Sequence, residues 1–102
     1  MHFSFNDKKI EGLYLREEYA KDYPADVIAN FFEVMAIIEG AKDERDFYAM
    51  KSLHFEKLAG KLGKEDKRSM RLTKQWRLIV SLSSTTEGKY LLVLNIDKHS
   101  YR

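Results

Sequence analysis

Arginine and lysine side chains that could bind a phosphate lie close together in the stretch RSMRLTKQWR, residues 68–77. Arg71 and Arg77 lie six residues apart in this stretch, and the chain can turn between them at Lys74 and Gln75. A turn at that point would put both guanidinium groups on one face of an antiparallel strand pair. Two guanidinium groups held side by side can bind one phosphate in a bidentate manner. The alternative is a pair of solvated arginines on surface strands.

His99 is the best candidate for proton transfer, because the unperturbed pKa of a histidine is about 6.5 and neighbouring cations can lower it. It directly follows the last predicted strand, and Asp97 can either orient its imidazole or simply end that strand. The alternative is a solvated histidine at a frayed terminus. We interpret the other two histidines, His2 and His54, as structural or solvated residues.

Two more cations and one aromatic residue in the same stretch have weaker claims to a role. Arg68 and Lys74 could add contacts to the same anion, or could be ordinary surface charges. Trp76 could stack on a nucleobase, but it adjoins Arg77 and has the opposite strand parity, which predicts a core position. The sequence carries no glycine-rich phosphate loop, no cluster with metal-ligand spacing and no nucleophile elbow. We therefore expect neither a metal site nor a cofactor.

The elements that must position these residues follow from hydrophobic spacing and turn signals. Apolar residues at helical spacing predict consecutive helices at residues 8–23 and 24–39, with Gly40 as a C-cap, and we expect them to form an antiparallel hairpin. Residues 41–67 predict a short helical turn and then a long loop. Period-two alternation and turn signals predict strands at residues 2–6, 68–73, 76–83 and 90–97.

This order of elements, β-α-α-β-β-β, predicts an α+β fold. Three consecutive C-terminal strands favour an antiparallel meander, so we expect a small, mostly antiparallel sheet of four strands packed against the N-terminal helix pair. The length of 102 residues fits one domain spanning residues 1–102.

The charge of the chain is small overall but unevenly distributed. The net charge is +2, with −5 in residues 1–50 and +7 in residues 51–102, which favours an anionic partner for the second half. Folding can remix charges that are separated in sequence. The chain has no cysteine, no apolar leader segment and no apolar run near the roughly 20 residues that span a bilayer. We expect a cytoplasmic protein with no membrane contact.

The stretch SMRLTKQWRL resembles the central signature of the RelE/ParE superfamily of toxins, and its HigB-like branch most closely. That signature reads Ser-Ile-Arg-aliphatic-Asn-x-Gln-Trp-Arg-aliphatic, and Thr73 stands where the superfamily has Asn. The upstream LHFEKLAG is similar to a family loop that contains His and Lys and ends in Gly, and LNIDKH is similar to its C-terminal Asp-x-His. The resemblance covers nearly the whole chain.

The resemblance implies a ribosome-dependent endoribonuclease that cuts mRNA in the decoding site. A cognate antitoxin, expected to be a HigA-like helix-turn-helix protein, would neutralise it. Metal-independent RNA cleavage uses the ribose 2′-OH as nucleophile and needs a base, an acid and cations that stabilise the phosphorane. The predicted catalytic residues are His99, Lys57, Arg77 and Asp97. The predicted RNA-binding residues are Arg71, Arg68, Lys61, Lys74 and Lys98.

The resemblance leaves some assignments open. Alignment from His54 makes Lys57 the counterpart of the loop lysine, whereas alignment on Gly60 leaves Lys57 or Lys61 to compensate. Lys98 stands where the family often carries Tyr.

Two other functions also stay open. One is a ParE-like inhibitor of DNA gyrase, and the other is a catalytically weakened module of the same fold that binds an antitoxin or a nucleic acid.

Overall fold

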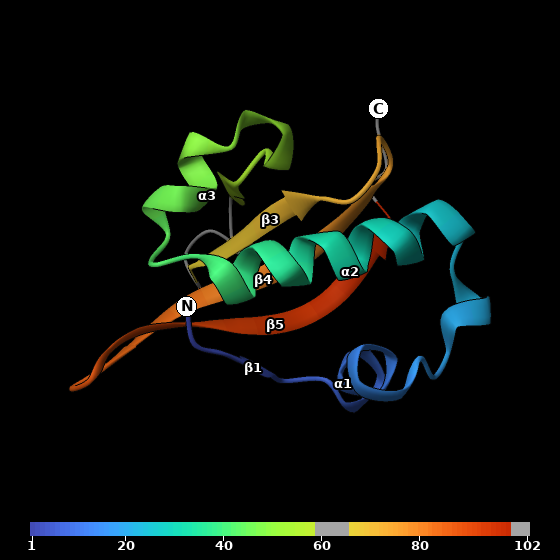
Figure 1. The fold of residues 1–102 in the computed structure, drawn as a ribbon, viewed down its shortest axis with the longest axis horizontal. Helices are drawn as coiled ribbons and strands as arrows, with labels where there is room; N and C mark the ends of the chain where they lie inside the picture. Colours follow the sequence, from blue (N-terminus) through green and yellow to red (C-terminus); the bar gives the residue numbers. More distant parts are fainter. Residues whose placement is uncertain (59–65, 99–102) are drawn as a thin grey trace.

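The fold is a five-stranded sheet with helices packed on one of its faces (Figure 1). The computed structural model describes residues 1–58 and 66–98. The strands are β1 Phe3–Phe5, β2 Glu56–Lys57, β3 Lys67–Arg71, β4 Trp76–Thr85 and β5 Gly88–Lys98. The helices are α1 Lys8–Arg16, α2 Ala25–Gly40 and α3 Arg45–Ala49, with 3-10 turns at Ala20–Asp22 and Lys51–Leu53.

The strand order is β1-β5-β4-β3-β2. β1 runs parallel to β5, and every other pair of neighbouring strands is antiparallel. The chain enters the sheet at β1, crosses the helical layer and returns to build the antiparallel part from β2 to β5. The predicted α+β class, the helix pair after the first strand and the mostly antiparallel sheet are confirmed.

The first helix is shorter than the sequence predicts. Asp7 caps its N-terminus, because Oδ1 accepts a hydrogen bond from the backbone of Lys9 at 2.7 Å. The helix ends at Arg16, because Glu17 takes a left-handed conformation with φ 56° and Tyr19 takes one again with φ 64°. The predicted continuation of this helix to residue 23 is therefore wrong, and a 3-10 turn occupies part of that segment.

The second helix forms where its apolar spacing predicts. Pro24 occupies the N-cap with φ −57°, a position where a missing N–H has little consequence. The core-facing residues of the helix are Val27, Phe31, Val34, Met35 and Ile38. Figure 1 shows α1 almost end-on while α2 lies across the view, so the two helices run in different directions. The predicted antiparallel hairpin is wrong, because the left-handed residues after α1 redirect the chain.

The short helical turn predicted after α2 is present as α3, but the loop predicted to follow it holds more structure than expected. Residues 50–58 contain a 3-10 turn and β2, which adds a fifth strand to the four predicted. Phe47, Leu53 and Phe55 are buried and anchor this segment to the core. A two-residue strand is too short for alternation to reveal in a sequence.

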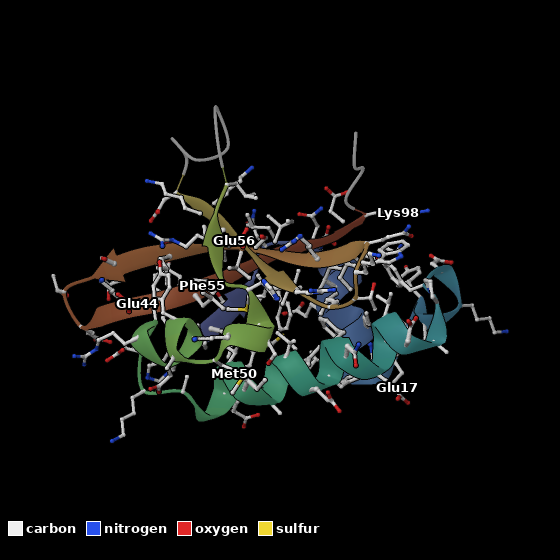
Figure 2. The ribbon with its side chains drawn as sticks, turned by 90° about the horizontal axis from the view of Figure 1, so that it is seen from above. Glu17, Glu44, Met50, Phe55, Glu56 and Lys98 are labelled. Atoms are coloured by element: carbon white, nitrogen blue, oxygen red, sulfur yellow. The ribbon has the colours of Figure 1, made fainter. Side chains whose placement is uncertain are left out.

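The core lies between the helices and one face of the sheet. Met70, Leu78 and Val80 are fully buried on that face. Side chains of the opposite strand parity point to the other face, which we call the outer face. By register, the outer face carries Glu56, Ser69, Arg71, Arg77, Ile79, Asn95 and Asp97. Figure 2 shows the helices gathered on the opposite side of the sheet.

Candidate functional site

Three predicted site residues form a row across the outer face. The register pairs Arg71 of β3 with Arg77 of β4, and pairs Arg77 with Asp97 of β5. Directly opposite residues on antiparallel strands share a face, with Cβ atoms about 4.5–5.5 Å apart. The predicted proximity of Arg71 and Arg77 is thus confirmed, while their role stays a prediction.

The chain reverses between the two arginines through a bend at residues 72–75. The backbone N–H groups of Leu72 and Thr73 both donate to the Trp76 carbonyl, at 2.9 and 3.1 Å. Thr73 Oγ1 accepts a hydrogen bond from the Trp76 backbone N–H at 3.2 Å. The bend includes the predicted turn at Lys74 and Gln75. Thr73, which replaces the Asn of the superfamily signature, closes the bend with its side chain.

His54 extends the arginine row by one residue. β2 pairs Glu56 with Ser69, and the same register, continued by two residues, brings His54 opposite Arg71. The side chains meet there, since His54 Nε2 lies 3.3 Å from Arg71 Nη1. An imidazole can transfer a proton, so His54 is a second acid or base candidate. The sequence alone favours a structural or solvated role for His54, and its only signal for the site is the His of LHFEKLAG.

The arginine pair of the row can attract an anion, while the carboxylate of Asp97 lies on the other side of Arg77. Arg71 and Arg77 are half-buried, and like charges directly opposite each other on paired strands repel. Arg77 Nη1 donates to the hydroxyl of the buried Ser69 at 3.5 Å. Glu56 is exposed and lies opposite Ser69, in the row next to the arginines. A phosphate between the two guanidinium groups would relieve their repulsion, which makes the row a candidate phosphate site.

Two of the predicted cations have the opposite strand parity. Lys57 pairs with Arg68, and Lys98 pairs with Trp76. Trp76 packs against the core and meets Tyr23 edge-to-face, with ring centroids 5.8 Å apart. The core position predicted for Trp76 is confirmed. The register therefore separates Lys57 and Lys98 from the arginine row, although both lysines are exposed.

Arg68 joins β3 to α3 on the helix side of the sheet. Its side chain is only 16% exposed. The guanidinium donates to Asp66 Oδ1 at 3.0 Å and to the hydroxyl of Tyr48. It also lies over the ring of Phe55, 5.6 Å from the centroid. These contacts direct Arg68 away from the row that contains Arg71.

Lys74, another predicted site residue, is exposed in the bend beside the arginine row. It borders a cleft of about 370 Å³ together with Pro24, Asp26 and Trp76. His99 and Lys61 lie outside the described residues.

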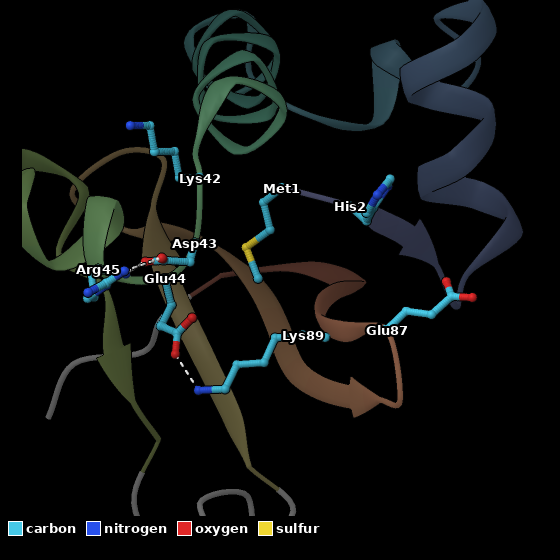
Figure 3. Close-up of a pocket in the computed structure, with 9 residues that line it drawn as sticks. Met1, His2, Lys42, Asp43, Glu44, Arg45, Glu87 and Lys89 are labelled. Atoms are coloured by element: carbon cyan, nitrogen blue, oxygen red, sulfur yellow. Dashed lines mark hydrogen bonds and ion pairs between the residues drawn. The ribbon is translucent and has the colours of Figure 1, made fainter.

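A cavity of about 520 Å³ lies at the other end of β4, beside the β4–β5 turn (Figure 3). Four of its charged groups form two ion pairs, since Lys89 Nζ lies 2.5 Å from Glu44 and Arg45 lies 2.8 Å from Asp43. Hydrogen bonds from Arg45 lower the pKa of Asp43 to about 2. This pairing stabilises the loop after α2, and we assign the cavity no ligand.

Within residues 1–58 and 66–98, no group of three or more His, Asp or Glu side chains is placed to hold a metal ion. No helix in this part of the chain has the length and apolar character needed to cross a membrane.

Residues 3–99 match the family of HigB-like toxins, described as the RelE-like toxin of type II toxin-antitoxin system HigB. The chain belongs to this family. None of the curated proteins compared with the chain matches it. The resemblance read from the SMRLTKQWRL signature is confirmed.

Two solved structures of toxins are similar to the HigB-like chain. A YoeB/ParE toxin from Agrobacterium tumefaciens has a TM-score of 0.59 and 14% identity, covering 98% of this chain and 100% of that chain. The YoeB-YefM complex from Staphylococcus aureus has a TM-score of 0.58 and 15% identity, covering 99% of this chain and 98% of that chain. These likenesses establish the RelE/ParE fold.

Proposed function

We propose that this HigB-like toxin is a metal-independent endoribonuclease that cleaves mRNA on the ribosome. The observation that carries the proposal is the row of His54, Arg71, Arg77 and Asp97 on the outer face. The row combines two cations that could hold a phosphate with an imidazole that could move a proton. Membership of a family of type II toxins supports the same conclusion.

The proposed reaction is attack by a ribose 2′-OH on its own 3′-phosphate. A base takes the 2′ proton, and an acid protonates the leaving 5′-oxygen. Arg71 and Arg77 stabilise the extra negative charge of the phosphorane between these two steps. The products are a 2′,3′-cyclic phosphate and a 5′-hydroxyl end, so no metal-bound water is needed.

The candidates for proton transfer are His99, His54 and Lys57, in that order. His99 stays the first candidate, because it follows β5 in sequence two residues after Asp97, which stands in the row. His54 is the second candidate, because it contacts Arg71 directly. Asp97 would orient one of these imidazoles. Lys57 ranks last, because its register sets it on the other side of the sheet.

The remaining cations divide into two groups. Lys61, Lys74 and Lys98 are kept as proposed contacts to RNA or ribosome, where lysines add salt-dependent affinity. Arg68 is removed from the proposed site, because Tyr48, Asp66 and Phe55 engage its guanidinium.

A cognate antitoxin is the proposed partner in the absence of stress. The Staphylococcus aureus neighbour is a YoeB-YefM complex, and the family belongs to type II toxin-antitoxin systems. We propose a HigA-like helix-turn-helix protein as the antitoxin of this chain. The ribosome and its mRNA would be the targets, which puts the site of action in the cytoplasm.

Induced expression followed by mapping of mRNA 5′ ends tests the proposed function. We expect new 5′-hydroxyl ends inside coding regions soon after induction. These ends should disappear when translation initiation is blocked, because cleavage requires a ribosome on the message. Arg77→Ala, which removes half of the arginine pair, is the negative control. Growth arrest without new 5′ ends would contradict the proposal.

The second candidate function is inhibition of DNA gyrase. It is favoured by the structural similarity of the chain to the YoeB/ParE toxin from Agrobacterium tumefaciens. A gyrase inhibitor would need neither His54 nor His99 for chemistry. Loss of gyrase supercoiling with purified protein, together with intact mRNA after induction, would favour this function over cleavage.

A further inference from the structure

Arg71 and Arg77 are held side by side against their mutual repulsion. Like charges directly opposite on antiparallel strands destabilise the strand pair. Asp97, opposite Arg77, offsets part of this repulsion, and backbone contacts restrain the two strand ends as well. Part of this restraint is the bend at residues 72–75, in which the Leu72 and Thr73 N–H groups both bind the Trp76 carbonyl.

Asn30, in the middle of α2, fixes this bend from the helix side. Its Nδ2 donates to the Leu72 carbonyl at 2.6 Å, in a partly buried hydrogen bond. Leu72 directly follows Arg71, and its own side chain is buried in the core. The residue after Arg71 is therefore held by both its side chain and its carbonyl group. Asn30 and Arg71 also border one cleft of about 240 Å³, together with Glu33 and Leu53.

We propose that Asn30 is a positioning residue for phosphate binding, which sets the separation of Arg71 and Arg77 by holding the Leu72 carbonyl. The inference rests on the proposed function, because the arginine row is the site that Asn30 would position. Preorganised groups need no rearrangement when charge develops in the transition state. A misplacement of about 1 Å can lower a rate by about 10²-fold. Asn30 acts through the arginine pair and not by contact with the substrate.

The test compares Asn30→Leu with the wild type, because leucine keeps the branched shape but has no donor. We expect single-turnover cleavage of mRNA on programmed ribosomes to fall by at least about 10-fold. The ribosome concentration at half-saturation should stay the same, because that affinity depends on many separate cationic contacts. Ile38→Ala, in the same helix, is the matched control. It opens a core cavity and lowers stability, but the folded protein should cleave at the wild-type rate.

A double-mutant cycle separates positioning from general destabilisation. In an Arg71→Ala background, Asn30→Leu should cause no further loss of cleavage, because the arginine it positions is already absent. Its effect on the melting temperature should be similar in both backgrounds. Wild-type cleavage by Asn30→Leu would overturn the inference. An equal loss of cleavage in both backgrounds would also overturn it, since Asn30 would then act without Arg71.

A phosphate titration keeps the inference testable if the wild-type toxin cuts no mRNA. That result would defeat the proposed function, and the positioning of an anion site would then be judged by NMR titration with inorganic phosphate. We expect Asn30→Leu to bind phosphate at least about threefold more weakly than the wild type, as for the loss of one hydrogen bond. Equal affinities, or no phosphate binding by the wild type, would overturn the inference.

Discussion

Arg71 Nη1 lies 3.3 Å from His54 Nε2, so one of the two guanidinium groups of the arginine row also contacts an imidazole. A neutral imidazole with its proton on Nδ1 accepts the guanidinium N–H through the lone pair of Nε2. The same lone pair must be free before His54 can take a proton from a ribose hydroxyl. A phosphate that accepts this guanidinium N–H in place of the imidazole would free the lone pair. Binding of substrate and release of the base could therefore be one event.

The two histidines can be told apart by glutamine substitutions, which keep a hydrogen-bonding group but cannot transfer a proton at neutral pH. We expect His99→Gln to lower single-turnover cleavage on programmed ribosomes by at least about 10²-fold, the usual contribution of a general acid or base. His54→Gln should cause a loss of similar size if the two imidazoles share the acid and base roles. Binding to the ribosome should change little, because it depends on many cations.

His2→Gln is the control for these two variants. His2 lines the cavity at the other end of β4, so the variant should cleave at the wild-type rate. Wild-type cleavage by His99→Gln alongside an inactive His54→Gln would transfer the role to His54. Should both variants cleave normally, a lysine such as Lys57 or Lys61 must move the proton and the histidine assignment is wrong.

Arg77→Ala removes the central cation of the row. We expect mRNA cleavage to fall by about 10²–10³-fold, as for the loss of one donor to a developing oxyanion, and growth inhibition to disappear. Arg77→Lys should recover only part of the activity, because an ammonium group cannot make the bidentate contact. Antitoxin binding, measured by calorimetry, should be unchanged in both variants.

Arg45→Ala is the matched control for this prediction. The Arg45 side chain is 86% exposed and pairs with Asp43 far from the row. The variant should arrest growth like the wild type. If cells that express Arg77→Ala arrest equally fast, the phosphate role of Arg77 is wrong.

The pairing of Arg71 with Arg77 could be predicted from the sequence because it depends only on residues that are close together in the chain. Arg71 and Arg77 lie on either side of one short bend, so strand alternation and a turn signal are enough to pair them. His54 belongs to the same row but depends on the pairing of β2 with β3 across residues 58–66. A two-residue strand carries no periodic signal in the sequence. The contact of His54 with Arg71 follows only from the pairing of β2 with β3 in three dimensions.

Strand parity explains the predictions that changed. Lys57 and Lys98 are close in sequence to the row, but each pairs with a residue of the helix side, Arg68 and Trp76. Arg68 directly precedes the signature that contains Arg71, and the odd spacing of three residues puts the two on opposite faces. Charge counts cannot distinguish these faces. The end of α1 could not be predicted from the sequence either, because the left-handed residues Glu17 and Tyr19 are not glycines.

The pKa of Asp43 offers a test that is independent of function. Hydrogen bonds from Arg45 lower it to about 2, from an ordinary value of 3.8. Because the folded-state pKa is the lower one, this carboxylate stabilises the fold above about pH 4, and the contribution is lost as the pH falls through about 2. Titration of the side-chain carboxyl carbon by NMR should give the lowered value.

The same titration in Arg45→Ala supplies the control. The pKa of Asp43 should return toward its ordinary value, because the main cause of its shift is gone. The pKa of Glu44 should stay lowered, because its shift comes mainly from the hydrogen bond of Lys89. An Asp43 that still titrates near 2 without Arg45 would contradict the attribution.

Arg68 should prove to be a structural residue and not an RNA ligand. Arg68→Ala removes the ion pair with Asp66, the hydrogen bond to Tyr48 and the stacking on Phe55. We expect the free energy of unfolding to fall by about 1–2 kcal/mol, as for one largely buried cation–π contact with a partly screened ion pair. Arg68→Met should lose less, because its aliphatic chain still covers the Phe55 ring. Urea denaturation measures both losses.

Under native conditions, the folded Arg68→Ala protein should cleave mRNA at the wild-type rate, whereas Arg77→Ala should be inactive at near-normal stability. A folded Arg68→Ala protein that no longer cleaves would return Arg68 to the RNA-binding set.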